Sequence, residues 1–168
     1  GVAAQIWDYI YRAKSNDAED LAFADATRQA GNVYYGVAFD LAGRGETIPK
    51  PLRPKTHLEY LEKTKWNVVV HGDTSEMYRG ENPIITFPEL AMAARGLGYL
   101  SIKFDRDGVF RRAPLLIKFS DGFYPSFPFR AICEFLKVPP EKIILKPGKS
   151  VTLKGAFPPG GIPHDIVI

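Results

Sequence analysis

Residues 98–114 read Gly-Tyr-Leu-Ser-Ile-Lys-Phe-Asp-Arg-Asp-Gly-Val-Phe-Arg-Arg-Ala-Pro. An apolar run before Asp105 and a second one after Gly108 are typical of two strands joined by a tight turn. Asp-Gly at the centre of such a turn favours type I′, because glycine adopts a positive φ without steric cost. The stretch therefore predicts an antiparallel hairpin with its turn at Asp107-Gly108.

Two arginines, Arg111 and Arg112, follow the predicted turn. Neighbouring residues on a strand point to opposite faces of a sheet, so one of the two faces inward or along an edge. A partly buried guanidinium needs carboxylate or carbonyl acceptors, and Asp105 and Asp107 are the nearest carboxylates in sequence. We expect a structural ion pair. A calcium loop is disfavoured, because Gly108 follows Asp107 directly and arginines come next.

The order of these residues resembles the type 2 CHASE domain (CHASE2), whose acronym stands for cyclase/histidine-kinase-associated sensory extracellular. The resemblance begins with Gly98-Tyr99-Leu100 and ends with Pro125-Ser126-Phe127 after a turn at Gly122. Its central part is the pattern Asp105-x-Asp107-Gly108-Val109-x-Arg111-Arg112-x-Pro114-Leu115. Residues 1–11 are similar to the family's first strand and residues 20–33 to its next helix and strand, so the resemblance runs from Gly1 to about Val138.

This resemblance implies an extracytoplasmic, periplasmic or extracellular, sensory domain of a membrane receptor. The implied partners are flanking transmembrane helices, a cytoplasmic output domain such as an adenylate or guanylate cyclase, a histidine kinase or a Ser/Thr kinase, a second copy in a homodimer, and an unidentified small-molecule ligand. No enzyme activity and no cofactor is expected of the domain itself. Because the chain starts and stops in strand-like patterns, we expect residues 1–168 to be one domain trimmed at both ends.

Composition agrees with a single globular core. A chain of 168 residues with 45% apolar content buries roughly two-thirds of its unfolded surface. The formal net charge is only +3, without a run of Lys or Arg, so nucleic acid is not an expected partner. Cys133 lies in an apolar pattern and is expected to be a buried hydrophobe.

The order of patterns predicts an α/β fold with a mixed, mainly parallel sheet flanked by helices and an antiparallel hairpin at one side. Residues 2–11 predict a strand buried on both faces. Asn16 or Asp17 caps a helix that stops at Gly31, and residues 32–40 return to a strand. Further predicted elements are helices at 55–65, 88–96 and 128–137, strands at 66–70, 143–145 and 151–153, and loops at 41–54 and 72–83.

The candidate site lies where the first strand ends. Asp8 occupies the end of a predicted parallel strand, where α/β folds place ligands, and Tyr9, Tyr11 and Tyr35 are candidates to line a small-molecule pocket with it. The plainer interpretation makes the tyrosines core and rim, and Asp8 a backbone cap.

Two other functional classes remain open. A hydrolase- or phosphatase-like enzyme using Asp8 requires a second carboxylate or a histidine beside it. His57, His71 and His164 are not spaced as a zinc helix requires, and no metal site is expected. The sequence does not separate a sensor from a constitutive structural or dimerisation module.

Overall fold

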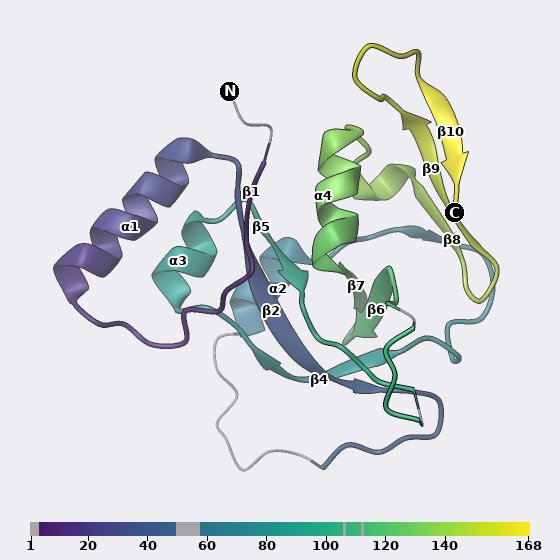
Figure 1. Cartoon of the computed structure of the whole chain (residues 1–168), viewed down its shortest axis with the longest axis horizontal. Coiled ribbons are helices and arrows are strands. Elements are labelled where there is room, and N and C mark those ends of the chain that lie inside the picture. Colours follow the sequence, from purple (N-terminus) through teal and green to yellow (C-terminus); the bar gives the residue numbers. More distant parts are fainter. Residues whose placement is uncertain (1–3, 50–57, 106, 112) are drawn as a thin grey trace.

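The computed structural model describes residues 4–49, 58–105, 107–111 and 113–168, which form two β-sheets and four α-helices (Figure 1). The helices are α1 (Asp17–Ala30), α2 (Leu58–Thr64), α3 (Pro88–Ala93) and α4 (Phe127–Phe135), and one 3₁₀ turn spans Pro140–Lys142. The strands are β1 (Gln5–Trp7), β2 (Val33–Ala42), β3 (Val69–Val70), β4 (Arg79–Ile84), β5 (Gly96–Tyr99), β6 (Leu116–Phe119), β7 (Gly122–Pro125), β8 (Ile143–Lys146), β9 (Ser150–Ala156) and β10 (His164–Val167).

The first sheet is organised around β2. Its path is β1-β2-β4-β6-β7, and β5 pairs with β2 off this path. An isolated bridge joins Tyr99, at the end of β5, to Ser126, just after β7. The strands of this sheet therefore come close to forming a closed ring.

The second sheet has the order β10-β9-β8-β3. Helix α4 lies between the two sheets (Figure 1), with Phe127 against Gly98 of β5 and with Phe129 and Cys133 in the hydrophobic cluster of the second sheet. Among the described residues, four strand pairs are parallel and four are antiparallel. The mixed α/β prediction is confirmed, but a mainly parallel sheet is not.

Helix α1 begins and ends where its sequence predicted. The Asn16 side chain accepts hydrogen bonds from the amides of Ala18 and Glu19, at 3.0 and 3.4 Å. Gly31 ends the helix in the left-handed region with φ of 67°. The chain then enters β2 parallel to β1, which confirms the predicted strand–helix–strand unit.

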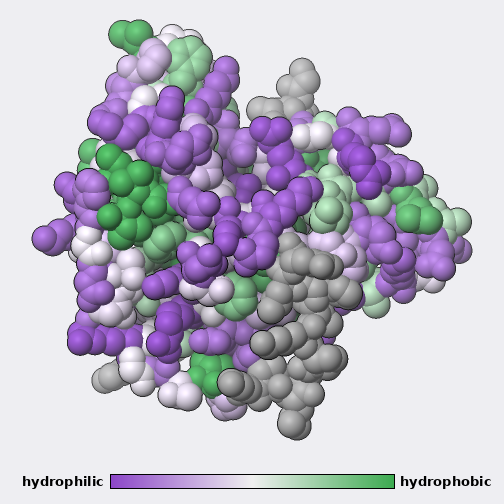
Figure 2. All heavy atoms as spheres, turned by 180° about the vertical axis from the view of Figure 1, so that it is seen from behind, coloured by the Kyte–Doolittle hydropathy of each residue, from purple (hydrophilic) through white to green (hydrophobic). Residues whose placement is uncertain are grey.

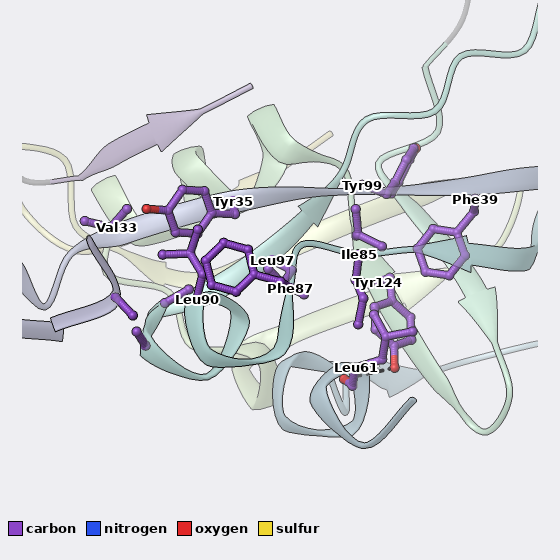
Figure 3. Packing of buried hydrophobic residues seen from close by; sticks show 14 of the residues in the cluster. Val33, Tyr35, Phe39, Leu61, Ile85, Phe87, Leu90, Leu97, Tyr99 and Tyr124 are labelled. Atoms are coloured by element: carbon purple, nitrogen blue, oxygen red, sulfur yellow. Dashed lines mark hydrogen bonds between the residues drawn. The ribbon is translucent and has the colours of Figure 1, made fainter. Parts of the chain in front are cut away.

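Two buried clusters hold these layers together. The larger one fills the first sheet and its helices, and Figure 3 shows Tyr35, Phe87 and Leu97 within it, as well as the 3.1 Å hydrogen bond from the Tyr124 hydroxyl to the Leu61 carbonyl. The second cluster lies between α4 and the second sheet and includes Trp66, Phe129, Cys133, Ile143, Leu145, Val151 and Leu153. Burial raises the pKa of the Cys133 thiol to about 12, which agrees with the expected buried hydrophobe.

The predicted hairpin at Asp107-Gly108 was wrong in its strands and in its turn type. Strand β5 ends at Tyr99 and β6 starts at Leu116, and in the described ladders they do not pair with each other. Gly108 has φ of 77°, in the left-handed region. The Gly108 amide donates to the Asp105 carbonyl at 2.9 Å, and the Asp105 amide donates to the Val109 carbonyl at 3.0 Å. This is the three-residue loop with a left-handed glycine.

Residues 100–104 lack a strand partner in the predicted direction because β2 holds them. The Leu100 amide donates to the Val37 carbonyl at 2.9 Å, and the Lys103 ammonium donates to the Leu41 carbonyl at 3.1 Å. The antiparallel hairpin of this region is instead β6–β7.

Two other expectations need correction. Strand β1 is a three-residue edge strand with Ile6 and Trp7 exposed, because it pairs with β2 on one side only. The loop expected at 72–83 contains most of β4, which pairs with β2 despite Pro83. Part of the helix expected at 55–65 lies outside the described residues; α2 covers the rest.

Candidate functional site

Arg111 organises the loop between β5 and β6. Its guanidinium lies 2.9 and 2.7 Å from the two carboxylate oxygens of Asp107 and 3.3 Å from Asp105 Oδ2. The contact predicted between Arg111 and the two aspartates is therefore present. Arg111 holds the pKa of Asp107 below its ordinary value. Arg111 is half exposed, so the pair orders a surface loop and contributes little to overall stability.

Gly98 and Pro114 belong to the same sequence pattern and constrain the backbone on either side of this loop. A Cβ at Gly98 would lie 2.7 Å from the Phe127 Cα, so glycine permits the close approach of α4 to β5. The Pro114 carbonyl accepts a hydrogen bond from the Tyr99 hydroxyl. Arg112 lies outside the described residues.

Large apolar side chains are exposed on the same loop. Ile102, Phe104, Val109 and Phe110 are all at least 44% exposed, and the rings of Phe104 and Phe110 meet edge to face at 6.5 Å. The sequence pattern had predicted that these side chains belong to two paired strands.

The three candidate tyrosines come together between β1, β2 and α1. The Tyr11 ring lies 4.6 Å from that of Tyr9 and 5.9 Å from that of Tyr35. Tyr35 is fully buried and its hydroxyl is 2.9 Å from Thr27 Oγ1. Burial raises the pKa of Tyr35. Tyr35 is thus a core residue, and Tyr9 and Tyr11 form the rim of the cluster.

Asp8 does not join them. Its side chain is exposed and makes no hydrogen bond or ion pair with any residue that the structure describes. It is also not the backbone cap that the plainer interpretation expected. Within the described ranges, no three His, Cys, Asp or Glu side chains converge as metal ligands would.

A groove of about 280 Å³ lies between α1 and α3, beside Tyr60 of α2. Leu21 and Met92 form its exposed apolar walls, at 51% and 46% exposure. Charged residues flank them: Arg28 pairs with Asp25, and Glu89 lies 2.5 Å from the Lys14 ammonium. The complete lining is Leu21, Ala24, Asp25, Arg28, Tyr60, Pro88, Glu89 and Met92.

Arg130 of α4 is a buried cation, with only 5% of its surface exposed. Its guanidinium lies 5.1 Å from the Trp66 ring and 5.7 Å from the Tyr34 ring, and donates to the Thr64 carbonyl at 3.0 Å. Its Nε has no hydrogen-bond partner within the described part of the chain. Burial lowers the pKa of Arg130 to about 10, so the side chain stays charged at neutral pH.

A comparison of the sequence with known protein families identifies the family of this chain. The CHASE2 domain family matches residues 1–165. The chain belongs to the CHASE2 family. Neither a curated protein nor a solved structure matches it. CHASE2 domains are extracellular sensory domains, so this chain has a sensory role. No helix among the residues described here is long and apolar enough to cross a membrane.

The enzyme alternative gains no support in this CHASE2 domain, because among the described residues Asp8 makes no hydrogen bond or ion pair with a second carboxylate or a histidine. Sequence reasoning missed the groove and Arg130. The groove had one detectable signal, the apolar Leu21 and Met92 on helices with polar neighbours. No sequence signal identified Arg130, because its burial depends on Gly96, which lies 34 positions away in the sequence.

Proposed function

We propose that this CHASE2 domain is the extracytoplasmic sensor of a membrane receptor, coupled through flanking transmembrane helices to a cytoplasmic cyclase, histidine kinase or Ser/Thr kinase. The observation that carries the proposal is the family match over nearly the whole chain. The structure supports it with a groove at the surface between α1 and α3.

The ligand of this sensor is a small molecule bound between α1 and α3. The groove volume of about 280 Å³ lies just below the roughly 300 to 1,000 Å³ of ligand pockets, so only a small molecule fits. Leu21, Met92 and Tyr60 offer apolar and aromatic contact, and the ion pairs at Asp25 and Glu89 offer polar contact at the rim. These features suit a compact molecule with an apolar body and one or two polar groups.

Helix α1 connects the groove to the rest of the fold. Ala24 lines the groove and belongs to the same buried cluster as Tyr35, and Thr27 one turn later contacts the Tyr35 hydroxyl. A ligand that binds one position of α1 against α3 better than another shifts the population of the two arrangements. A coupling free energy of about 1 to 3 kcal/mol is typical of such signalling.

A thermal-shift screen with a groove-filling variant tests the ligand site. A binder raises the melting temperature of the native chain by mass action. Met92→Trp fills the groove, and Ile132→Trp places the same residue at an equally exposed position of α4, 46% in both cases. We expect a binder to stabilise the native chain and the Ile132→Trp variant, but not Met92→Trp. Equal stabilisation of all three would place the ligand elsewhere.

The coupling itself is tested in the full-length receptor. Its catalytic output should change when the binder is added, and Met92→Trp should abolish that response. An output that ignores a binder with a proven groove site would instead identify a constitutive structural module.

A further inference from the structure

The linker between β1 and α1 is fastened to the start of α3. The Tyr11 amide donates a hydrogen bond to Thr86 Oγ1 at 2.9 Å, and the Thr86 hydroxyl donates to the Tyr11 carbonyl at 3.1 Å. The Phe87 amide, directly before α3, donates to the same carbonyl at 2.6 Å. Figure 1 shows this linker running past the beginning of α3 on its way to α1. These hydrogen bonds tie the position of the linker to that of α3.

A lysine of the same linker contacts a carboxylate of the ligand groove from outside. Lys14 Nζ lies 2.5 Å from Glu89 Oε1 of α3 and 3.7 Å from Asp17 Oδ1. Glu89 lines the groove, whereas Lys14 does not. The Lys14 and Glu89 side chains are each 37% exposed, so water reaches this ion pair and its contribution to stability is small. The ion pair is therefore a second, exchangeable attachment of the linker to α3.

The described residues that line the groove carry one more negative than positive charge. Asp25 and Glu89 are acidic, and Arg28 is basic. Asp25 and Arg28 pair with each other on α1, so their charges compensate within the groove. The Glu89 carboxylate receives a compensating charge from Lys14 of the linker. A cation that enters the groove can take over the role of Lys14.

Apolar surface lies next to Glu89. Met92 follows Glu89 by three positions on α3, so both side chains project from the same face of the helix. Leu21 contributes another apolar wall from α1. Figure 2 shows α1 from behind, at the right, as mostly hydrophilic surface with a few apolar residues. A ligand in the groove thus finds a carboxylate beside a small apolar surface.

We propose that the groove binds a protonated amine, whose ammonium replaces the Lys14 ammonium at Glu89 and releases the linker between β1 and α1. This amine site rests on the function proposed for the groove. Exchange of one ammonium for another keeps the Glu89 carboxylate compensated, and the released lysine regains its side-chain freedom. The apolar body of the amine is then covered by Leu21 and Met92. A carboxylate ligand would meet the excess negative charge of the groove, and a neutral ligand would leave Lys14 in place.

The exchange gives groove occupancy a route to β1. With Lys14 displaced, the linker loses one of its attachments to α3, and the hydrogen bonds at Tyr11 open more often. The linker follows β1 directly, and β1 pairs with β2. An amine therefore favours the arrangement with a loosened linker, because a ligand shifts a protein toward the state that it binds better.

Three probes that share one apolar body test the charge preference. Benzylamine, benzyl alcohol and benzoate differ at the polar group, and the methyl resonance of Met92 in an NMR titration reports binding in the groove. Met77 packs against the second buried cluster, so its methyl group is the internal control. We expect benzylamine to bind the native chain roughly threefold more tightly than benzyl alcohol, and benzoate to bind least. Glu89→Gln should abolish the preference for the amine.

Removing the competing lysine gives the sharpest readout. In Lys14→Met the ligand ammonium has no lysine to displace, so benzylamine should bind roughly fivefold more tightly than to the native chain. The affinity for benzyl alcohol should stay constant. Asp17→Asn is the matched control, since it removes the other carboxylate near Lys14 at an 86% exposed position outside the groove lining. It should leave the affinity for benzylamine unchanged.

Hydrogen exchange measures the release of the linker. The amides of Tyr11 and Phe87 should exchange roughly threefold faster in Lys14→Met, and also in the native chain saturated with benzylamine. Saturation with benzyl alcohol should leave both exchange rates unchanged, because this probe does not displace Lys14.

The amine site would be overturned by benzyl alcohol binding the native chain as tightly as benzylamine, or by a benzylamine affinity that does not rise in Lys14→Met. Tyr11 and Phe87 amides that ignore bound benzylamine would overturn it too, as would a Met92 methyl resonance that none of the three probes shifts. In each case, a binder from the thermal-shift screen that Met92→Trp excludes would still identify the groove as the ligand site. The amine preference and the ligand site are therefore decided by separate measurements.

Discussion

At the scale of single residues, two glycines of β5 set how closely α4 approaches the first sheet. A Cβ at Gly96 would lie 2.4 Å from Arg130 Nη1, and one at Gly98 would lie 2.4 Å from the Phe127 ring and 2.7 Å from its Cα. At Gly96 the obstacle is the end of a side chain, whereas at Gly98 it includes backbone. A Cβ at Gly98 could therefore be accommodated only if helix α4 moved as a whole.

Gly98→Ala should destabilise the fold by about 1 to 3 kcal/mol, because overpacking a closed contact forces backbone to shift. Urea unfolding measures the change. Gly43→Ala is the matched control, since a Cβ there meets its nearest atoms at 3.5 Å, an ordinary contact. We expect the control to change stability by less than about 0.5 kcal/mol. Equal effects at both positions would contradict the role assigned to Gly98.

Buried tyrosines predict instability at alkaline pH. Burial, with a smaller contribution from Glu134, raises the pKa of Tyr34 to about 12, and burial also raises the pKa values of Tyr99 and Tyr124 above the ordinary 10. Above pH 10 the unfolded chain loses these protons and the folded chain retains them, so stability is full below pH 10 and falls as the pH rises. Urea unfolding between pH 8 and about 12 should show this decline, and Tyr34→Phe should reduce its slope. An unchanged slope would mean that Tyr34 titrates normally.

At the scale of elements, the loop between β5 and β6 shows what the sequence determined and what it left open. Asp105, Asp107 and Arg111 are close in sequence, so their ion pairs were predictable. The turn type was not, because a two-residue and a three-residue turn both accept Gly108 at positive φ. The strands were not predictable either, since residues 100–104 form a strand only if a partner lies in register.

Among the helices and in the candidate site, too, some features follow from local sequence and others only from the fold. Helix α1 was predictable because its cap, Asn16, and its stop, Gly31, are local signals. The groove between α1 and α3, and the burial of Arg130 against β5, depend on residues brought together only by the fold. The candidate tyrosines lie together because Tyr9 and Tyr11 follow β1 and Tyr35 belongs to its parallel partner β2, whereas Asp8 at the strand end faces solvent.

Removing Arg111 should loosen the β5–β6 loop without unfolding the protein. In Arg111→Gln, Asp105 and Asp107 lose their charged partner, and we expect the amides of Asp105 and Gly108 to exchange roughly three to ten times faster. The unfolding midpoint should stay nearly constant, since exposed ion pairs contribute little. Hydrogen exchange followed by NMR measures the loop. Arg28→Gln, which breaks the exposed pair with Asp25 on α1, should leave these amides unchanged.

At the scale of the whole molecule, Trp66 joins the two sheets. Its backbone exchanges hydrogen bonds with Phe123 of β7 at 2.8 and 3.2 Å, and its side chain belongs to the cluster under the second sheet. Its ring lies 5.9 Å from that of Phe129 on α4. Because α4 and Trp66 contact both sheets, the two buried clusters are linked through them, and we expect residues 1–168 to unfold as one domain.

Truncations in each cluster test that expectation. Leu97→Ala, in the first cluster, and Leu153→Ala, in the second, each remove a fully buried side chain and should cost about 2 to 5 kcal/mol. If the two clusters unfold cooperatively, each variant shifts one single transition, and fluorescence and circular dichroism give the same midpoint. Ile162→Ala, at an 82% exposed position, should leave that transition in place. A Leu153→Ala variant whose second sheet melts ahead of the first would show two folding units and contradict the expectation of a single domain.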